Sequence, residues 1–316
     1  MDLAIPTGQS SSDDVIKVRH GLRPLSGFGY VDLKERLGMR NIVEGKHSRL
    51  EFDSIGDLRK TASEYRNFGV IPHMLAEDKK WFGGVRDFDE ILKLARIGWD
   101  SQLEDTLSVV GDTLESVERE YDMPTWHGFY DVSGADVDVA RYLSGEPENM
   151  ISYLMVETPK AGRVITLVMN VGAGAGVSAQ ILIARGKAVV ALVCAIESIG
   201  LRTELKAELQ VIGANGFTTH TVVTVKEAGE DLDPALVMFA YAHPAFFRGL
   251  MIVSQGAHPE RFHKPMKMNS SNGEPVRKAW KGELPEEAIR VQPEIGTSAA
   301  EAKEFVVKHL KSLGII

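Results

Sequence analysis

The chain has 316 residues, with a hydrophobic content of 44%, a charged content of 25% and a formal net charge of −8. This length allows large buried cores and predicts two domains, and the composition is that of an ordinary globular protein. The acidic balance excludes a generally basic nucleic-acid-binding protein. The single cysteine, Cys194, excludes an intrachain disulfide framework and a cysteine-based zinc site.

Cys194 lies within a run of apolar residues, so we expect a buried thiol on a helix rather than a nucleophile. The first residues lack the basic start and the apolar core of a secretory signal. No window approaches the roughly 18 uninterrupted apolar residues that would cross a bilayer. We therefore expect a protein of a reducing, intracellular compartment that makes no membrane contact.

The first half of the chain predicts little parallel sheet. Residues 1–14 are polar and are expected to be disordered, and residues 15–150 are expected to form a mainly helical α+β region. Its expected elements are a helix over Asp32–Leu37, a strand over Arg49–Asp53, a helix capped by Ser54, a helix capped by Asp87 with Glu90 closing a capping box, a helix over Gln102–Tyr121, a strand over Trp126–Val132 and a helix over Asp136–Leu143.

The second half predicts an α/β domain core over residues 151–254, built on a mostly parallel sheet. Its first strand, Arg163–Met169, is nearly all apolar and rich in β-branched residues, which is typical of a strand covered on both faces. The remaining expected elements are a glycine-rich loop from Gly172, a helix from Ser178 to Ile199, strands over Thr203–Val211 and Thr219–Val225, a helix over Leu232–Tyr241, a strand over Leu250–Val253, a basic surface loop at 255–283 and, within 284–316, a C-terminal helix (Thr297–Leu313) that packs on this domain. The short turn Gly213–Gly216 predicts that the two middle strands form an antiparallel hairpin at the edge of the sheet.

The glycine-rich loop is the strongest candidate for ligand binding. Free amides of such a loop and the dipole of the following helix attract phosphate, and the binding residues would be Gly172, Gly174, Gly176 and Ser178. The Gly-x-Gly-x-Gly spacing departs from the Gly-x-Gly-x-x-Gly of dinucleotide sites, and the expected acidic residue would fall at Glu197, inside the helix. No Gly-Lys-Ser/Thr of a P-loop is present. A connector that permits close strand–helix packing is therefore the favoured alternative, and no cofactor is expected.

The order of buried strand, long helix and antiparallel hairpin over Val164–Val225 resembles a von Willebrand factor A-type domain. That resemblance implies a Rossmann-like fold whose metal-ion-dependent adhesion site needs Asp-x-Ser-x-Ser after the first strand, because hard cations prefer carboxylate and hydroxyl oxygens. The matching stretch is Asn170-Val171-Gly172-Ala173-Gly174, which lacks the carboxylate and both hydroxyls. We therefore expect a degenerate site that holds no metal ion.

Asp131, Ser133 and Asp136 supply oxygens in one turn and are weak candidates for binding Mg²⁺ or Ca²⁺. Capping of the next helix by Asp136 and Asp138 is the favoured alternative. The histidines are scattered without the spacing of a zinc site, and no Ser, His and Asp can be assembled into a triad from spacing. No catalytic residue is assigned, and an enzymatic activity is not favoured.

The stretch 255–282 concentrates basic side chains around Phe262 and Trp280, aromatic residues that can stack on bases. Candidate nucleic-acid contacts are Arg261, Lys264, Lys267, Arg277, Lys278 and Trp280. A solvated charged loop is the favoured alternative, so nucleic acid is not the favoured partner.

Several short motifs occur along the chain: Trp81-Phe82-Gly83-Gly84 with Gly98-Trp99, Asp131-Val132-Ser133-Gly134-Ala135, Leu143-Ser144-Gly145-Glu146-Pro147-Glu148, Arg185-Gly186-Lys187-Ala188 and His243-Pro244. Together they resemble a group of uncharacterised proteins encoded by tailed bacteriophages and prophages. The resemblance extends from about Trp81 to Arg248 and implies a viral or mobile-element origin, but no activity. It places the protein in the host cytoplasm or in the virion.

The leading hypothesis is thus a phage-encoded, non-enzymatic protein that acts as a protein-interaction scaffold or accessory factor and has a protein partner. One alternative is a nucleotide-binding enzyme or sensor that uses the loop Gly172–Ser178. Another is a nucleic-acid-binding accessory protein that uses residues 255–282. The sequence leaves the identity of the partner and the oligomeric state open.

Overall fold

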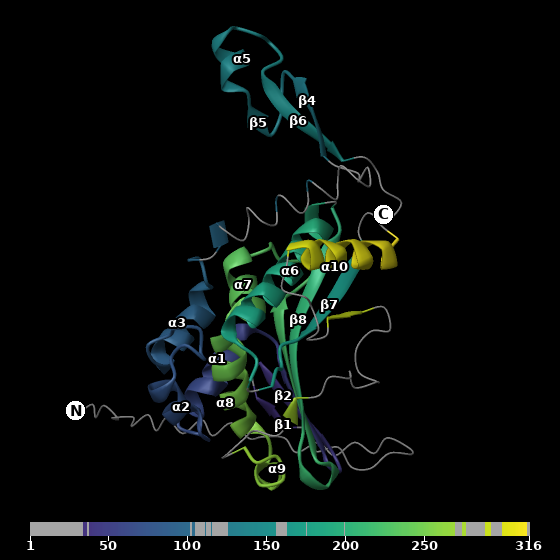
Figure 1. Ribbon diagram of the computed structural model, residues 1–316. Coiled ribbons are helices and arrows are strands. Elements are labelled where there is room, and N and C mark those ends of the chain that lie inside the picture. Colours follow the sequence, from purple (N-terminus) through teal and green to yellow (C-terminus); the bar gives the residue numbers. More distant parts are fainter. Residues whose placement is uncertain are drawn as a thin grey trace, which may run out of the picture.

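The computed structural model describes residues 34–36, 38–101, 103–104, 111, 115, 126–155, 163–174, 176–198, 200–268, 274–275, 288–291 and 299–314. The described chain forms a main α/β body and a small three-stranded sheet that stands away from it (Figure 1). The disorder expected at residues 1–14 and most of the helix expected over Gln102–Tyr121 lie outside the described residues.

The body is built on one mixed sheet with the strand order β1-β2-β3-β9-β8-β7-β11, and β10 pairs with β8 beyond the end of β7. Its strands are β1 Lys34–Arg36, β2 Met39–Glu44, β3 His47–Phe52, β7 Val164–Asn170, β8 Arg202–Ile212, β9 Thr218–Lys226, β10 Glu274–Pro275 and β11 Ile289–Val291. The pairs β3–β9, β7–β8 and β7–β11 are parallel, and the other pairs are antiparallel. The prediction of a helix over Asp32–Leu37 is wrong for Lys34–Arg36, which form strand β1 and pair with β2.

The expected hairpin forms between β8 and β9, but it lies in the middle of the sheet rather than at its edge. β3 pairs in parallel with β9 along its whole length, from His47 opposite Thr218 to Phe52 opposite Val223. Strands and helices that precede residue 150 therefore share one sheet and one hydrophobic core with those that follow it. The prediction that the hairpin lies at the edge of the sheet was wrong, because nothing in the local sequence of β9 shows which strand will pair with its other side.

Helices gather on one face of this sheet (Figure 1). They are α1 Ile55–Glu64, α2 Ile71–Glu77, α3 Phe88–Ile97, α6 Ala179–Ser198, α7 Pro234–Ala242, the π-helix η2 Phe246–Met251, α8 Ile252–Ser254, the 3-10 helix η3 Gln255–Ala257, α9 Glu260–His263 and α10 Ala299–Ser312, with the 3-10 turn η1 Ala214–Gly216 inside the hairpin. The expected caps are confirmed: the side chain of Ser54 accepts a hydrogen bond from the amide of Asp57, and that of Asp87 accepts one from Glu90. The carboxylate of Glu90 accepts from the amide of Arg86, so the capping box is displaced by one residue.

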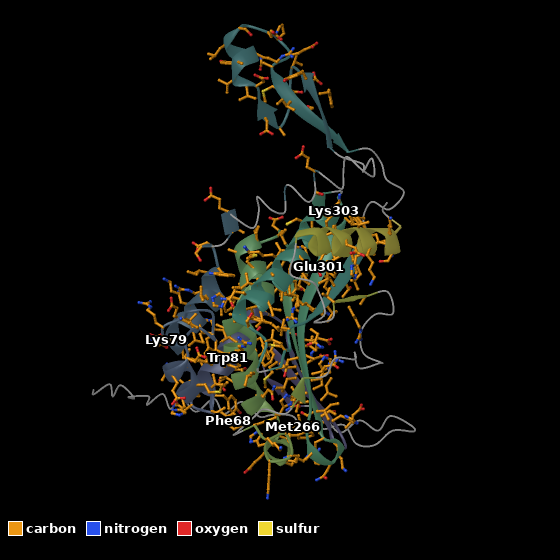
Figure 2. The ribbon with its side chains drawn as sticks, viewed as in Figure 1. Phe68, Lys79, Trp81, Met266, Glu301 and Lys303 are labelled. Atoms are coloured by element: carbon orange, nitrogen blue, oxygen red, sulfur yellow. The ribbon has the colours of Figure 1, made fainter. Side chains whose placement is uncertain are left out.

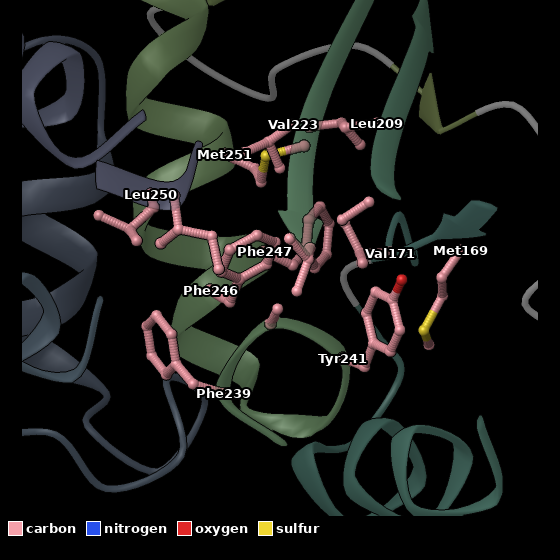
Figure 3. Close-up of a cluster of buried hydrophobic side chains, with 14 of the residues drawn as sticks. Met169, Val171, Leu209, Val223, Phe239, Tyr241, Phe246, Phe247, Leu250 and Met251 are labelled. Carbon is pink, nitrogen blue, oxygen red and sulfur yellow. The ribbon is translucent and has the colours of Figure 1, made fainter. Parts of the chain in front are cut away.

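Side-chain alternation gives the sheet one apolar face and one polar face. Aromatic side chains of α7 and η2, including Phe239 and Phe246, pack in the core that also holds Leu209 and Val223 of the sheet (Figure 3). Helix α6 is long and apolar enough to cross a membrane, but most of it is buried inside the body, with α7 and α10 packed on it. This is the position of a core helix of an α/β domain.

The segment after α7 differs from the expected strand and surface loop. Leu250–Val253 belongs to the end of η2 and to α8, because a short apolar run without periodicity fits a buried helix as well as a buried strand. The segment then continues inside the body, where Gln255, His258 and Phe262 are buried. The first third of the expected basic loop is therefore part of the core.

The small sheet, called here the β4–β6 module, covers residues 126–155 and has the antiparallel order β4-β6-β5. Its elements are β4 Trp126–Asp131, β5 Asp136–Val137, α5 Val139–Leu143 and β6 Met150–Met155. The expected strand at Trp126 is confirmed. The expected helix starts later than predicted, because Asp136 belongs to β5 and Asp138 is the residue that caps α5.

Candidate functional site

The β4–β6 module exposes an unusual density of apolar side chains. Seven of the eleven exposed large hydrophobic side chains among the described residues lie in it, although it contributes only a small part of the chain. They are Phe129, Tyr130, Val132, Val137, Val139, Tyr142 and Leu143, and Leu143 is 78% exposed. None of the side chains described between Phe129 and Ser152 is buried, and Figure 2 shows them standing around a sheet that the body does not cover.

Polar contacts hold together the part of the module whose side chains are described, residues 129–152, where no side chain is buried. The hydroxyl of Tyr130 donates to Asp138 Oδ2 at 2.9 Å, and the Arg141 guanidinium lies 3.8 Å from the centre of the Tyr130 ring. Arg141 also pairs with Glu146 at 2.6 Å. Hydrogen bonds from the Arg141 amide and from Tyr130 lower the pKa of Asp138. These contacts fix α5 on β4 and leave the apolar side chains outside.

The turn between β4 and β5 is held by the backbone of β6. The amide of Ala135 donates to the carbonyl of Ile151 at 2.9 Å, and Ser152 Oγ donates to the carbonyl of Ser133 at 2.8 Å. A Cβ on Gly134 would lie 2.4 Å from the Ile151 carbonyl oxygen, so only glycine fits there.

The metal candidates of this turn do not converge. Asp131 lies opposite Met150 and Asp136 opposite Ile151, so the two side chains point to opposite faces of the module. Asp131 Oδ1 accepts from the amide of Val132 at 2.6 Å. Among the described residues, no group of three His, Cys, Asp or Glu side chains is placed to hold a metal ion.

The glycine-rich loop connects β7 to α6, as the sequence predicted. Asn170, at the end of β7, accepts from the amide of Gly172 at 2.9 Å, and Ser178 Oγ accepts from the amide of Ile181 at 3.3 Å. Ser178 thus caps α6. β7 pairs with β8 on one side and with β11 on the other, which places the loop at the carboxyl ends of the strands where ligands bind in many α/β sheets.

Two buried arginines contact this loop. Arg185 of α6 donates from Nη2 to the carbonyl of Val171 at 3.2 Å. Arg248 of η2 donates to the carbonyls of Val177 and Trp81, and its guanidinium lies 4.1 Å from the centre of a Trp81 ring. Burial lowers the pKa of each arginine to about 10. Sequence reasoning missed this pair, although each arginine interrupts a run of apolar residues.

The predicted nucleic-acid contacts are only partly placed. Arg261, Lys264 and Lys267 are exposed around α9, while the predicted contacts at Arg277, Lys278 and Trp280 lie outside the described residues. Phe262 is wholly buried and packs edge-on against Phe217, so it cannot stack on a base.

The polar face of the main sheet carries a buried histidine–glutamate pair that the spacing of residues in the sequence did not reveal. His220 of β9 and Glu208 of β8 are both buried, and His220 Nε2 lies 2.9 Å from Glu208 Oε2. Burial lowers the pKa of His220, so the neutral ring donates this hydrogen bond to the carboxylate. The hairpin register, which sets Gln210 opposite His220, was the signal that could have found the pair.

A protein-family model described as a domain of unknown function (DUF7192) matches residues 30–316. No curated protein matches the chain, and no solved structure does.

Proposed function

The chain belongs to the DUF7192 family, and we propose that it is a non-enzymatic interaction scaffold that docks a partner protein on the β4–β6 module. The observation that carries this proposal is the cluster of exposed apolar side chains on a module without a buried side chain between Phe129 and Ser152. Large exposed apolar patches mark interaction sites.

Energetics favour an occupant for this surface. A small sheet gains independent stability from a buried hydrophobic face or from a helix packed on it. Here polar contacts hold α5 on the sheet, and no side chain between Phe129 and Ser152 is buried. Burying a Val, Leu or Phe side chain contributes about 1.5–3 kcal/mol. Covering exposed apolar side chains of the module, such as Leu143, would therefore stabilise both the module and the complex.

The charges of the module indicate the chemistry of the partner. Between residues 129 and 152 the acidic side chains are Asp131, Asp136, Asp138, Glu146 and Glu148, against the single basic Arg141. A second copy of the same acidic surface would be repelled, since like charges facing each other oppose association. We therefore infer a different protein, one that offers an apolar surface with basic side chains around it.

The body would serve as the support. Its buried strand β7, long helix α6 and antiparallel hairpin β8–β9 follow the order of a von Willebrand factor A-type domain, and we infer this kinship from that order. Asn170, Gly172 and Gly174 offer neither the carboxylate nor the hydroxyls of that fold's metal site. We propose that the body carries the module without ion-dependent adhesion.

The proposal is tested by selecting peptides from a displayed random library on the full-length chain. Enriched peptides should combine apolar residues with Lys or Arg, and their affinity should fall as salt rises. Leu143→Ser should weaken binding about 10- to 100-fold, because one buried leucine is lost. Ile212→Ser, which changes an exposed apolar residue on the hairpin of the body, is the control.

Two results would contradict the proposal. One is a set of selected peptides whose affinity does not change in Leu143→Ser. The other is a concentration-dependent dimer, seen by sedimentation, that Leu143→Ser dissociates, since it would make a second copy the occupant.

A further inference from the structure

Two glycines in the loop between β7 and α6 are not required by the fold. Gly174 and Gly176 are exposed, and a Cβ on either would meet no atom within 4 Å. Gly174 does not belong to the glycines with positive φ. The close strand–helix packing expected at this loop is therefore not the reason for these two glycines. What their missing side chains do provide is open access to the loop backbone.

Positive charge accumulates around the same loop, and no carboxylate of the described residues forms an ion pair with it. Ser178 caps α6, a 20-residue helix, so the partial positive charge of its N-terminus lies at the end of the loop. Arg185 and Arg248 are 3% and 0% exposed, and they donate hydrogen bonds to neutral backbone carbonyls of the loop and of Trp81. A cation near a helix N-terminus is unfavourable, and burial makes it more so.

Each guanidinium also retains an unused donor. The Nε atoms of Arg185 and Arg248 are buried and have no hydrogen-bond partner in the described part of the chain. Neither arginine forms an ion pair there, and Asp78 influences Arg248 only through its more distant charge. Buried arginines with this arrangement of donors match the geometry of a phosphate group.

We propose that the described residues of the loop, 171–174 and 176–178, together with Arg185 and Arg248, bind the phosphate group of a small molecule. The anion would neutralise the two guanidinium groups, accept from their unused donors and complement the N-terminus of α6. The site lies where β7 is flanked by β8 and β11, at the carboxyl ends of the parallel strands.

The ligand is a compact phosphate ester or free phosphate rather than a dinucleotide. The acidic residue that could have contacted a ribose, Glu197, lies at the opposite end of α6. Its carboxylate accepts from the amide of Thr203 at 2.9 Å and pairs with Lys226 at 3.0 Å. Glu197 therefore has a structural role at the C-terminal end of α6, far from the loop.

The test compares the melting temperature of the full chain in sodium phosphate, glucose 6-phosphate, ATP and NAD with that in sodium chloride of equal ionic strength. Phosphate and the sugar phosphate should raise the melting temperature with increasing concentration, since a ligand of the folded state stabilises it. Equal effects of the two would indicate recognition of the phosphate alone, and a stronger effect of the ester would indicate contacts to its organic part.

Gly174→Asp should weaken this response about tenfold or more, because it places a carboxylate beside the bound anion. Gly174→Asn is the matched control of the same size without the charge, and both changes fall at an exposed position where a Cβ would meet no atom within 4 Å. Arg185→Gln should also weaken the response. The proposal is overturned if wild type responds to phosphate no more than to chloride, or if Gly174→Asp responds as Gly174→Asn does.

Discussion

His258 makes the stability of the body sensitive to acid. Its ring is buried, with Nδ1 at 2.8 Å from Ser48 Oγ and Nε2 at 3.3 Å from Thr221 Oγ1. Burial, reinforced by the nearby His263 and His220, lowers its pKa from 6.5 to about 3. The folded chain therefore keeps this imidazole neutral over a pH range in which the unfolded chain protonates it.

The sign and size of the effect follow from this difference in protonation. Between pH 6.5 and about pH 3 the unfolded state binds one proton more at this residue, so the free energy of unfolding falls as the pH falls. The slope is about 1.4 kcal/mol per pH unit. Between about pH 7.5 and pH 5 this one histidine should thus remove about 2 kcal/mol of stability.

Urea unfolding at a series of pH values measures this loss. His258→Gln should lower the stability at neutral pH by about 1–3 kcal/mol, because Ser48 and Thr221 lose a partner. Its stability should then fall by about 2 kcal/mol less than that of wild type on going to pH 5. His73→Gln, the same substitution at an exposed position on α2, is the control. Parallel curves for wild type and His258→Gln would refute the reasoning.

Two further predictions concern packing and charge. Gly186→Ala should destabilise the body by about 1–3 kcal/mol in urea unfolding, since the new Cβ would lie 2.3 Å from Ala242 Cα; this outweighs the gain in helix propensity of about 1 kcal/mol. Gly229→Ala, in open space, should be neutral in the same assay. Glu197→Gln should lower the melting temperature, because Lys226 is 3% exposed at its side chain and would lose its anionic partner. An unchanged melting temperature would show that the carbonyls of Thr203 and Glu227 satisfy Lys226 without an anionic partner.

The elements that the sequence predicted are those with strong local signals. β7, α6, β8, β9, α7 and α10 appear close to their expected bounds, because apolar runs, capping residues and turn glycines lie within each segment. The prediction of a strand over Leu250–Val253 was wrong because an apolar run of four residues is too short to show a helical or a strand period. The pairing of β3 with β9 joins residues about 170 positions apart, and no local pattern contains that information.

The residues around the glycine-rich loop also divide into those that local sequence patterns predicted and those that depend on long-range packing. Gly172, Gly174, Gly176 and Ser178 were found because a strand, a glycine-rich turn and a helix cap follow one another in the sequence. The arginines that contact the loop come from the middle of α6 and from η2. Their role depends on how those helices pack, and the sequence shows only that a charge interrupts an apolar run.

For a related reason, the sequence did not predict that the apolar residues of the β4–β6 module are exposed. In sequence, Phe129, Val137 and Val139 have the pattern of residues that face a core, and that pattern specifies an apolar face without specifying what covers it. In the body the same kind of pattern is buried by helices, while in the module the described side chains meet no such layer. The number of elements available to cover each face, which only the fold reveals, decides whether an apolar pattern becomes a core or a docking surface.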